Sequence, residues 1–399
     1  MDKMSNLNIQ NLNPYPFAYL SNLLKDSKPG DNKIIDLSIG EPKNSPPQEV
    51  ITLLNDNSQK FSQYPTSFGI SKLRSSYSEW LSSRFNLKTP IDPEKNVLPL
   101  GGTREGIFSF FQANIDSSKK HPMTVIPNPF YKIYEGASVA AGASCFYINQ
   151  LKENNFSPDF DSIPNHVWEN CQLLMLCSPS NPTGQCLNLG EYKKALLLAD
   201  KFNFLVCSDE CYTDIYPSKN QAPIGLLQAS EELGLFSRSV IFHSLSKRSS
   251  LAGLRSGFVC AHEDVIEKFL LYRTYHGVTL PLPTQEASTW AWSNKEHVEK
   301  NRISYDKKYD NALTKLQNFK DIKRPDGSFY LWIETPMDDQ VFTKRLYVEK
   351  GLITLPGSYL GTLDQGLNPG TGFIRVAIVH NKEIISEGME RLAEFLSTC

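Results

Sequence analysis

The segment 243–257 (HSLSKRSSLAGLRSG) gathers residue types that together favour the binding of an anion. It follows the apolar run 239–242 (SVIF), and it combines serine hydroxyls with Lys247, two arginines and two glycines. Hydroxyls and cations bind phosphate oxygens, and glycines let the backbone approach them closely. A Walker loop places its glycines first and its Lys-Ser/Thr pair last. Because the order here is different, the segment predicts a phosphate site for a ligand other than a nucleotide.

Three further loops carry polar residues directly after predicted strands, at 100–104 (LGGTR), 178–184 (SPSNPTG) and 208–212 (SDECY). The first of them opens a predicted helix at residue 103, and the free backbone N–H groups of a helix start suit an anion. Taken singly, each loop has an ordinary explanation as a turn, a helix cap or solvated surface. Four such loops together, each after a strand, favour one shared site.

The elements that must position these loops alternate between short apolar runs and helical stretches. The apolar runs lie at 123–127, 144–149, 172–178, 204–209, 240–244 and 257–261. Apolar residues recur at helical spacing over 103–115 and 191–202. This alternation predicts an α/β fold with a mostly parallel central sheet and helices on both faces. Ligands of such sheets bind beyond the carboxyl ends of the strands, where the polar loops lie.

The pattern divides the chain into three segments. Residues 1–45 are rich in Asn, Pro and Ser, and we expect them to form an extended N-terminal arm that belongs to a small domain. Residues 46–284 hold the alternating strands and helices of a large domain. Residues 285–399 are expected to form a smaller α+β domain, with a helix near 294–318 and strands near 328–333 and 372–378.

The composition is that of an ordinary soluble globular protein, with 399 residues, 40% hydrophobic and 21% charged. The net charge of −2 gives no basic field for nucleic acid or an anionic membrane. The first twenty residues lack the features of a signal peptide, and no apolar stretch is long enough to span a bilayer, so we expect a cytoplasmic protein. The eight cysteines and seven histidines are dispersed, which favours reduced thiols and no metal site.

The four loops and several other segments together resemble the fold-type-I aminotransferases that use pyridoxal 5′-phosphate (PLP), over nearly the whole chain. Within that superfamily the chain most resembles the succinyldiaminopimelate aminotransferase group. The segments that carry the resemblance are YPFAYL, DLSIGEPK, YPTSFGISKLR, GGTREGIF, NPFYKIYEGA, SPSNPTG and SLSKRSSLAGLRSGF. The resemblance implies a fold-type-I PLP transferase, in which a mostly parallel sheet with helices on both faces is joined to a smaller α+β domain.

The resemblance implies that Lys247 forms the Schiff base with PLP and, once substrate has displaced it, moves the proton between the substrate Cα and the cofactor C4′. A cationic neighbourhood is expected to lower the pKa of this lysine. Ser244, Ser246 and Arg255 are implied to hold the phosphate. Gly102, Thr103 and Arg104 are implied to complete the same cup through their N–H groups at the helix start.

The resemblance also implies partners for the cofactor ring. Asp209 pairs with the pyridine nitrogen and keeps it protonated, while Asn181 and Tyr212 hydrogen-bond the phenolic oxygen. Tyr131 stacks on the ring, although core packing would explain an aromatic residue there equally well. Tyr64 matches a tyrosine that reaches the phosphate of the partner subunit, so a homodimer with shared active sites is expected.

The substrate α-carboxylate is implied to bind Arg375, with Gly40 of the arm and Asn181 beside it. An arginine inside an apolar strand is costly unless it is paired, which favours this function for Arg375. A distal carboxylate would need a second cation. The candidates near matched motifs are Lys43, Arg248 and Arg273, and we favour Arg273.

The implied reaction is the reversible transamination between N-succinyl-LL-2,6-diaminopimelate and 2-oxoglutarate, which gives N-succinyl-2-amino-6-ketopimelate and glutamate, in lysine and diaminopimelate biosynthesis. A broad aspartate/aromatic transaminase, an acetylornithine-type transaminase and a PLP-dependent C–S β-lyase stay open, because motifs do not report the geometry that decides the outcome. A PLP-sensing transcription regulator needs a DNA-binding domain before the fold, for which this sequence leaves no room. A phosphate-binding kinase is disfavoured because the Walker order is missing.

Overall fold

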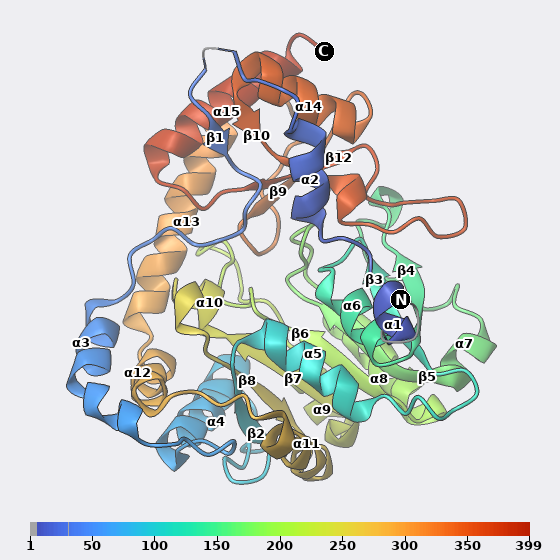
Figure 1. Cartoon of the computed structure of the whole chain (residues 1–399), viewed down its shortest axis with the longest axis vertical. Helices are drawn as coiled ribbons and strands as arrows, with labels where there is room; N and C mark the ends of the chain where they lie inside the picture. Colours follow the sequence, from blue (N-terminus) through green and yellow to red (C-terminus); the bar gives the residue numbers. More distant parts are fainter. Residues whose placement is uncertain (1–5, 31) are drawn as a thin grey trace.

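The computed structural model describes residues 6–30 and 32–399, and its larger part is built around one seven-stranded sheet (Figure 1). The strands follow the order β2-β8-β7-β6-β5-β3-β4. Strands β3 to β7 pair in parallel, and only β8 runs antiparallel to its neighbours, so the predicted mostly parallel sheet is confirmed. The strands are β2 Val97–Leu100, β3 Met123–Asn128, β4 Ser144–Asn149, β5 Cys171–Cys177, β6 Leu205–Asp209, β7 Ser239–Ser244 and β8 Gly257–Ala261.

Helices cover both faces of this sheet because successive strand residues point to opposite sides. In β5, Leu174 and Leu176 pack into the apolar cluster of one face, whereas Leu173 and Met175 pack into the cluster of the other. The first face is covered by α4 Ser71–Phe85, α7 Asn165–Asn170, α8 Leu189–Phe202, α9 Leu226–Leu233 and α12 Leu282–Ser293. The second is covered by α5 Thr103–Asn114, α6 Ile133–Ala140 and α11 Glu263–His276.

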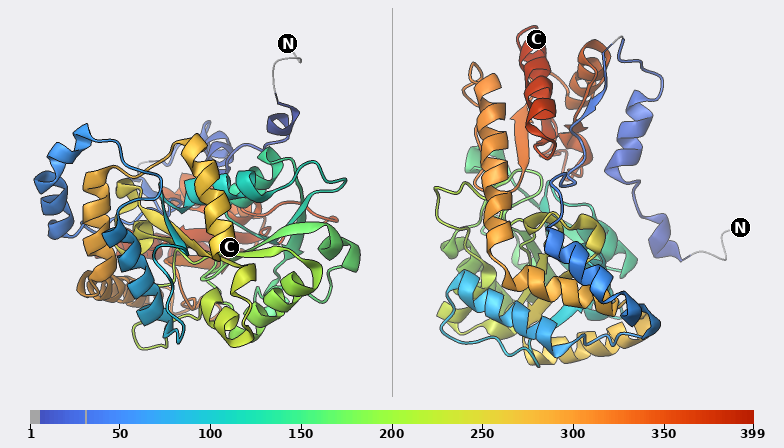
Figure 2. Two further views of the ribbon diagram at one scale, coloured as in Figure 1. Left: turned by 90° about the horizontal axis from the view of Figure 1, so that it is seen from below. Right: turned by 90° about the vertical axis from the view of Figure 1, so that its left-hand side faces the viewer.

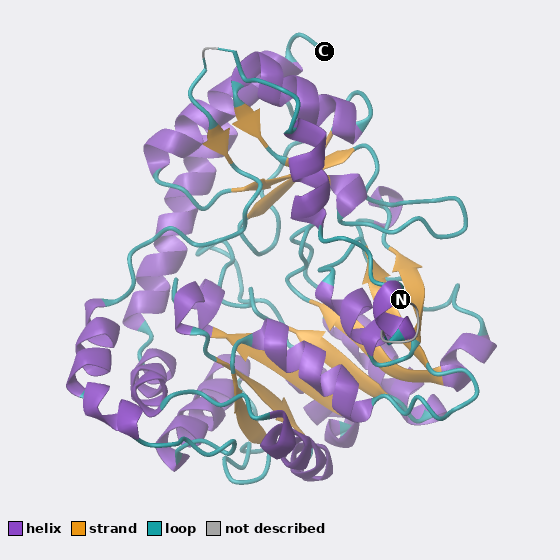
Figure 3. Cartoon of the chain, in the orientation of Figure 1, coloured by secondary structure: helices purple, strands orange, loops and turns teal. Residues whose placement is uncertain are grey.

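A smaller α+β part lies beyond one edge of the large part, and helix α13 (Glu296–Lys315) connects the two (Figures 1 and 2). It contains a three-stranded antiparallel sheet in the order β11-β12-β9 and a two-stranded parallel sheet β1-β10 (Figure 3). Its strands are β1 Ile35–Asp36, β9 Tyr330–Glu334, β10 Leu352–Ile353, β11 Leu355–Pro356 and β12 Phe373–Ala377. Its other helices are α14 Asp339–Lys350 and α15 Lys382–Leu396.

The N-terminal arm differs from the extended segment that its composition predicts. It contains two helices, α1 (Leu7–Gln10) and α2 (Pro16–Leu24), while residues 1–5 lie outside the described residues. Helix α2 forms because Pro16 is suited to a first helical position, and Leu20 is buried against Leu355 and Leu360. Strand β1 then pairs with β10, which attaches the arm to the small part. Helix α12 spans the expected boundary at residue 284, and the exact division into domains stays a prediction.

The remaining helical elements are a helix that packs on the large part and several short turns. Helix α3 (Gln48–Asp56) packs on α12. Short 3-10 turns lie at η1 Ser58–Ser62, η2 Lys152–Asn154, η3 Phe236–Arg238, η4 Ala252–Leu254 and η5 Gly357–Tyr359. Within the described ranges, no helix combines the length and the apolar character that a membrane crossing requires.

Candidate active site

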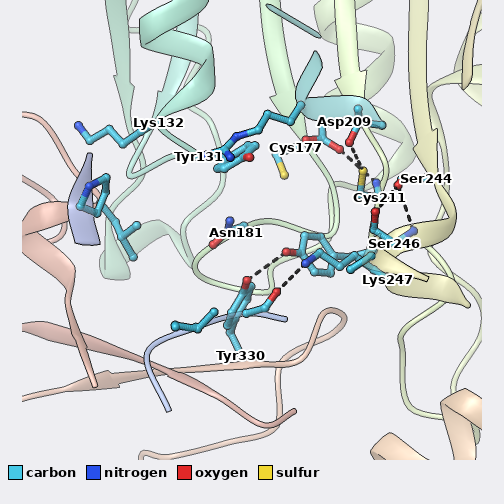
Figure 4. Close-up of a pocket in the computed structure, with 18 of the residues that line it drawn as sticks. Tyr131, Lys132, Cys177, Asn181, Asp209, Cys211, Ser244, Ser246, Lys247 and Tyr330 are labelled. Carbon is cyan, nitrogen blue, oxygen red and sulfur yellow. Dashed lines mark hydrogen bonds between the residues drawn. The ribbon is translucent and has the colours of Figure 1, made fainter. Parts of the chain in front are cut away.

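A cavity of about 640 Å³ is lined by the loops at the carboxyl ends of the large sheet together with residues of the small part and the arm (Figure 4). The predicted site residues that line it are Gly40, Thr103, Arg104, Tyr131, Asn181, Asp209, Tyr212, Ser244, Ser246, Lys247, Arg255 and Arg375. Residues from all four polar loops therefore meet in one place. Gly102 does not line the cavity itself but precedes Thr103, which does, and Tyr64 is exposed and does not line the cavity.

The predicted phosphate cup lies between the start of α5 and the short helix α10 (Leu245–Arg248). The Ser244 side chain caps α10 by accepting a hydrogen bond from the Ser246 backbone N–H at 3.1 Å. The Arg255 guanidinium donates to the Gly101 carbonyl at 3.2 Å and passes against Gly102. A side chain at position 102 would collide with this guanidinium, and the backbone there has a φ of +86°, so glycine is required. Hydroxyls, a guanidinium and free helix N–H groups thus converge on one anion position.

Lys247 presents its amine to the cavity from α10. Its Nζ donates a hydrogen bond to the Gly40 carbonyl at 2.6 Å, which brings the arm against the lysine. The pKa of Lys247 is lowered to about 8, mainly by burial and in part by the nearby charge of Arg375. The predicted decrease is therefore confirmed, but burial rather than the cationic neighbourhood is its main cause. A larger neutral fraction makes this amine a better nucleophile and proton acceptor near neutral pH.

Asp209 ends strand β6, where its carboxylate lies under the cavity. Its Oδ2 accepts a hydrogen bond from the Tyr134 hydroxyl at 2.8 Å, and its Oδ1 accepts one from the Cys211 backbone N–H at 3.2 Å. Burial raises the pKa of Asp209, while these hydrogen bonds oppose the increase by stabilising the carboxylate. Tyr134 was missed by the sequence reasoning. The signal was available, because Tyr134 follows Tyr131 by three residues at the start of α6, and such residues share a helix face.

Arg375 lies in the middle of strand β12, and its guanidinium reaches the cavity without a carboxylate partner among the described residues. Its Nη1 donates to Asn181 Oδ1 and its Nη2 to the Ser38 carbonyl, both at 2.8 Å. Its buried Nε has no hydrogen-bond partner. A buried guanidinium that holds only neutral acceptors keeps its charge available, and a planar carboxylate fits its fork. The geometry is therefore that of a carboxylate-binding residue.

The aromatic residues around the cavity include one that the sequence reasoning missed. Tyr131 and Tyr134 pack edge to face, with ring centroids 5.8 Å apart. Tyr330, on strand β9, is buried under Arg375, whose guanidinium carbon lies 4.2 Å from the centre of its ring. The Tyr330 and Tyr212 hydroxyls lie 3.1 Å apart. Nothing in the sequence indicated that Tyr330 belongs to the site, because it lies in an ordinary apolar strand and in no recognised motif.

The cation favoured for a distal carboxylate was predicted wrongly. Arg273 is buried on α11, where its Nη1 pairs with Glu105 Oε1 at 2.7 Å, and it does not line the cavity. Arg248 is buried as well, because its Nε pairs with Asp214 Oδ2 at 2.8 Å. Lys43 lies outside the cavity and pairs with Glu41. The sequence could not show these partners, since each ion pair except that of Lys43 joins residues far apart in the chain.

Two other cations line the cavity. Arg104 projects from α5 and forms no ion pair with a described residue, and its guanidinium carbon lies 5.0 Å from the centre of the Tyr15 ring. Lys132 precedes α6, and its Nζ donates to the Thr362 hydroxyl at 2.8 Å and to the Gly361 carbonyl at 3.0 Å. It also forms an ion pair with Glu135, whose Oε2 lies 3.6 Å from this Nζ and which does not line the cavity. Burial lowers the pKa of Lys132. Both cations line the cavity together with Tyr15 of the arm.

Tyr64 is fully exposed and makes no contribution to the cavity of its own chain. Its contact with the phosphate of a partner subunit stays a prediction. Among residues 6–30 and 32–399, no group of three or more His, Cys, Asp or Glu side chains could hold a metal ion.

The side chains present fit PLP. Asp209 offers a buried carboxylate for the ring nitrogen, Lys247 offers an amine with a lowered pKa, and Tyr131 offers an aromatic wall. Ser244 and Ser246 offer hydroxyls beside the start of α5 for the phosphate. When bound, PLP supplies an electron sink that eases removal of the substrate Cα proton. Fold and site together define a fold-type-I enzyme that uses PLP.

Comparisons with known proteins identify the family. Residues 32–392 match the family aminotransferase class I and II. The chain is 30% identical over 397 residues to an LL-diaminopimelate aminotransferase from Dehalococcoides mccartyi, a match that covers 98% of each. Solved structures of an aminotransferase from Neisseria meningitidis (37% identity, TM-score 0.94, 98% and 100% coverage) and of aminotransferase AspB from Helicobacter pylori (33%, 0.90, 97% and 100%) are similar throughout. The chain belongs to the class I and II aminotransferases, and it is a PLP-dependent enzyme that acts on amino acids and 2-oxo acids.

Proposed function

We propose that this aminotransferase interconverts N-succinyl-LL-2,6-diaminopimelate and 2-oxoglutarate with N-succinyl-2-amino-6-ketopimelate and glutamate, in lysine and diaminopimelate biosynthesis. The relatives named LL-diaminopimelate aminotransferase support a diaminopimelate skeleton. Arg375 supports a substrate with an α-carboxylate next to the reacting carbon. The cavity wall that carries Arg104 and Lys132, called the distal wall from here on, supports the choice between the free and the succinylated skeleton.

The distal wall offers two cations and no carboxylate among the described residues that line the cavity there. Arg104 and Lys132 line it, whereas Asp209 is the only carboxylate among the described residues that line the cavity, and it lies under the cofactor position. Free diaminopimelate presents an ammonium and a carboxylate at its distal end. Succinylation replaces the ammonium by an amide and adds a second carboxylate. Since a carboxylate removed from water needs a cationic partner, the wall favours the succinylated substrate.

The residues of the chain then have the following proposed roles. Arg375 binds the α-carboxylate, and the arm carbonyl of Gly40 keeps the Lys247 amine at the reacting carbon. Lys247 moves the proton between the substrate Cα and the cofactor C4′, which its lowered pKa permits near neutral pH. Asp209 holds the ring nitrogen, and Tyr212 donates to the phenolic oxygen. Packing of the arm over the site excludes water.

Charge-removing variants of the distal wall test this proposal. We expect Arg104→Met and Lys132→Met each to lower kcat/KM for the succinylated substrate by about 10²-fold, the cost of a lost charge-assisted hydrogen bond. Alanine has no distal carboxylate, so its kcat/KM should change less than about twofold. Lys43→Met, which removes a cation outside the cavity, is the matched control and should affect neither substrate. Unchanged kinetics with the succinylated substrate in both wall variants would contradict the proposal.

Transamination of unsubstituted LL-diaminopimelate is the second candidate, since the named relatives carry that activity in their names. A distal ammonium would favour a carboxylate beside it, and Asp209, at the cofactor position, is the one carboxylate among the described residues that line the cavity of one chain. The proposal also includes a homodimer, in which the exposed Tyr64 reaches the site of the partner, and a cytoplasmic location. Light scattering over a dilution series measures whether the protein stays dimeric, and it tests the proposed homodimer.

A further inference from the structure

Tyr330 joins three parts of the active site although no role was predicted for it. The residue is buried on β9, the strand that pairs with β12 next to Arg375. Its hydroxyl lies 3.1 Å from the Tyr212 hydroxyl, and its ring lies under the Arg375 guanidinium at 4.2 Å. A side chain at position 40 would collide with its hydroxyl, so the ring also defines the path of the arm. One side chain thus contacts the tyrosine, the arginine and the arm segment of the site.

Only one of the two hydroxyls can donate the hydrogen of the bond between them. A tyrosine hydroxyl has a single hydrogen, so it donates to one partner at a time while still accepting from another. If Tyr212 donated to Tyr330, it could not also donate to the phenolic oxygen of the cofactor. Neither hydroxyl has another hydrogen-bond partner among the described residues. The direction of this one bond therefore decides whether the Tyr212 hydrogen is available to the cofactor.

We propose that Tyr330 is a positioning residue that donates to Tyr212 and thereby directs the Tyr212 hydrogen to the phenolic oxygen of PLP. Donation into Tyr212 also polarises its O–H bond, which makes Tyr212 a stronger donor. A stronger donor stabilises the anionic phenolic oxygen. The pKa at which the bound cofactor changes its visible absorbance is then lower than it would be without Tyr330.

The ring of Tyr330 has a separate role. The face of an aromatic ring attracts a guanidinium, and stacking fixes the plane in which the Arg375 fork meets a carboxylate. This effect acts through Arg375 and concerns substrate binding, whereas the hydroxyl acts through Tyr212 and concerns the cofactor. The two roles can therefore be separated by removing the hydroxyl alone or the whole ring.

The fold offers a matched control. Tyr305, on α13, is buried in the same apolar cluster as Tyr212 and Tyr330 and stacks on Phe329. Its buried hydroxyl has no hydrogen-bond partner. Tyr305→Phe removes a neighbouring buried hydroxyl without touching Tyr212, so it reports any general effect of such a change on the cluster.

The test is a pH titration of the visible absorbance of the PLP-loaded protein without substrate. We expect Tyr330→Phe to raise the absorbance pKa by about half a unit, Tyr305→Phe to leave it unchanged, and Tyr330→Phe to add nothing in a Tyr212→Phe background. The KM for glutamate should stay within about twofold in Tyr330→Phe and rise about tenfold in Tyr330→Leu, which also removes the ring. An unshifted absorbance pKa in Tyr330→Phe, an equal shift in Tyr305→Phe, or the full shift in the Tyr212→Phe background would overturn the proposal. Because the titration uses no substrate, its outcome is independent of the proposed succinylated substrate.

Discussion

The lowered pKa of Lys247 gives a prediction for the protein without cofactor. Burial lowers this pKa from the ordinary 10.5 to about 8. At pH 7, about one tenth of an amine with a pKa of 8 is neutral, against about 3 in 10,000 for a pKa of 10.5. The buried amine should therefore present about 300 times more of its nucleophilic form than an ordinary lysine at that pH.

Competitive labelling with trace acetic anhydride, read by peptide mass spectrometry, measures this property at each lysine as the pH is varied. Lys300 is the internal reference, because it is fully exposed and its hydrogen bond to Glu296 raises its pKa. The labelling midpoint of Lys247 should lie near pH 8, well below that of Lys300. Arg375→Met should move the Lys247 midpoint upward, because Arg375 contributes to the decrease. A Lys247 midpoint near 10 would refute the account of how burial activates this amine.

The same shift has a consequence for stability. A lysine whose pKa is lower in the folded than in the unfolded state destabilises the fold below the folded pKa, and the penalty disappears as the pH rises towards the unfolded pKa. The cofactor-free protein should therefore gain stability between about pH 8 and 10.5 through Lys247. Lys247→Met should remove that gain and stabilise the cofactor-free protein at pH 7. Urea denaturation of the two proteins across this range measures the difference, and parallel stability curves would contradict it.

Three further changes test other parts of the site. Asp209→Asn should retain most of its PLP, measured by absorbance, while its turnover falls by orders of magnitude, because the amide cannot keep the ring nitrogen protonated. Near-normal turnover of this variant would show that Asp209 serves only as a structural cap. Asp214→Asn leaves the buried guanidinium of Arg248 without a counter-charge, so the free energy of unfolding should fall by about 3–5 kcal/mol in urea titrations. A fall of less than about 1 kcal/mol would contradict a structural role for this ion pair. Mixing Lys247→Ala with a Tyr64 variant that binds PLP poorly should restore activity if the sites are shared, whereas activity no greater than the sum of the parents, despite subunit exchange, would count against sharing.

The fold was predictable because its signals are local. The apolar runs of the large sheet are buried on both faces, so they stand out in the sequence as continuous strands, and β4 and β8 have the predicted bounds. That the residues expected to bind phosphate would lie together was predictable for a similar reason, since Ser244, Lys247 and Arg255 lie within twelve residues of one another. Residues that follow successive parallel strands reach the same edge of the sheet, which explains why the separate loops meet.

The rest of the site depends on contacts that the sequence does not encode locally. Arg273 stands near a matched motif, but it forms an ion pair with Glu105, which lies on another helix. Tyr330 becomes part of the site only because β9 pairs with β12 and brings its ring beneath Arg375. The arm was expected to be extended from its composition, yet α2 gains its stability by packing Leu20 against the small part. In each of these cases the outcome depends on a contact between segments that are far apart in the sequence.

The substrate choice is the central claim, and one comparison tests it most directly. The kcat/KM of the wild-type enzyme should be measured with N-succinyl-LL-2,6-diaminopimelate and with LL-2,6-diaminopimelate, using 2-oxoglutarate as the acceptor in both cases. Because Arg104 and Lys132 place two cations on the distal wall and no carboxylate lines it among the described residues, we predict a preference of about 10²-fold or more for the succinylated compound. An equal or higher kcat/KM with unsubstituted LL-2,6-diaminopimelate would contradict it.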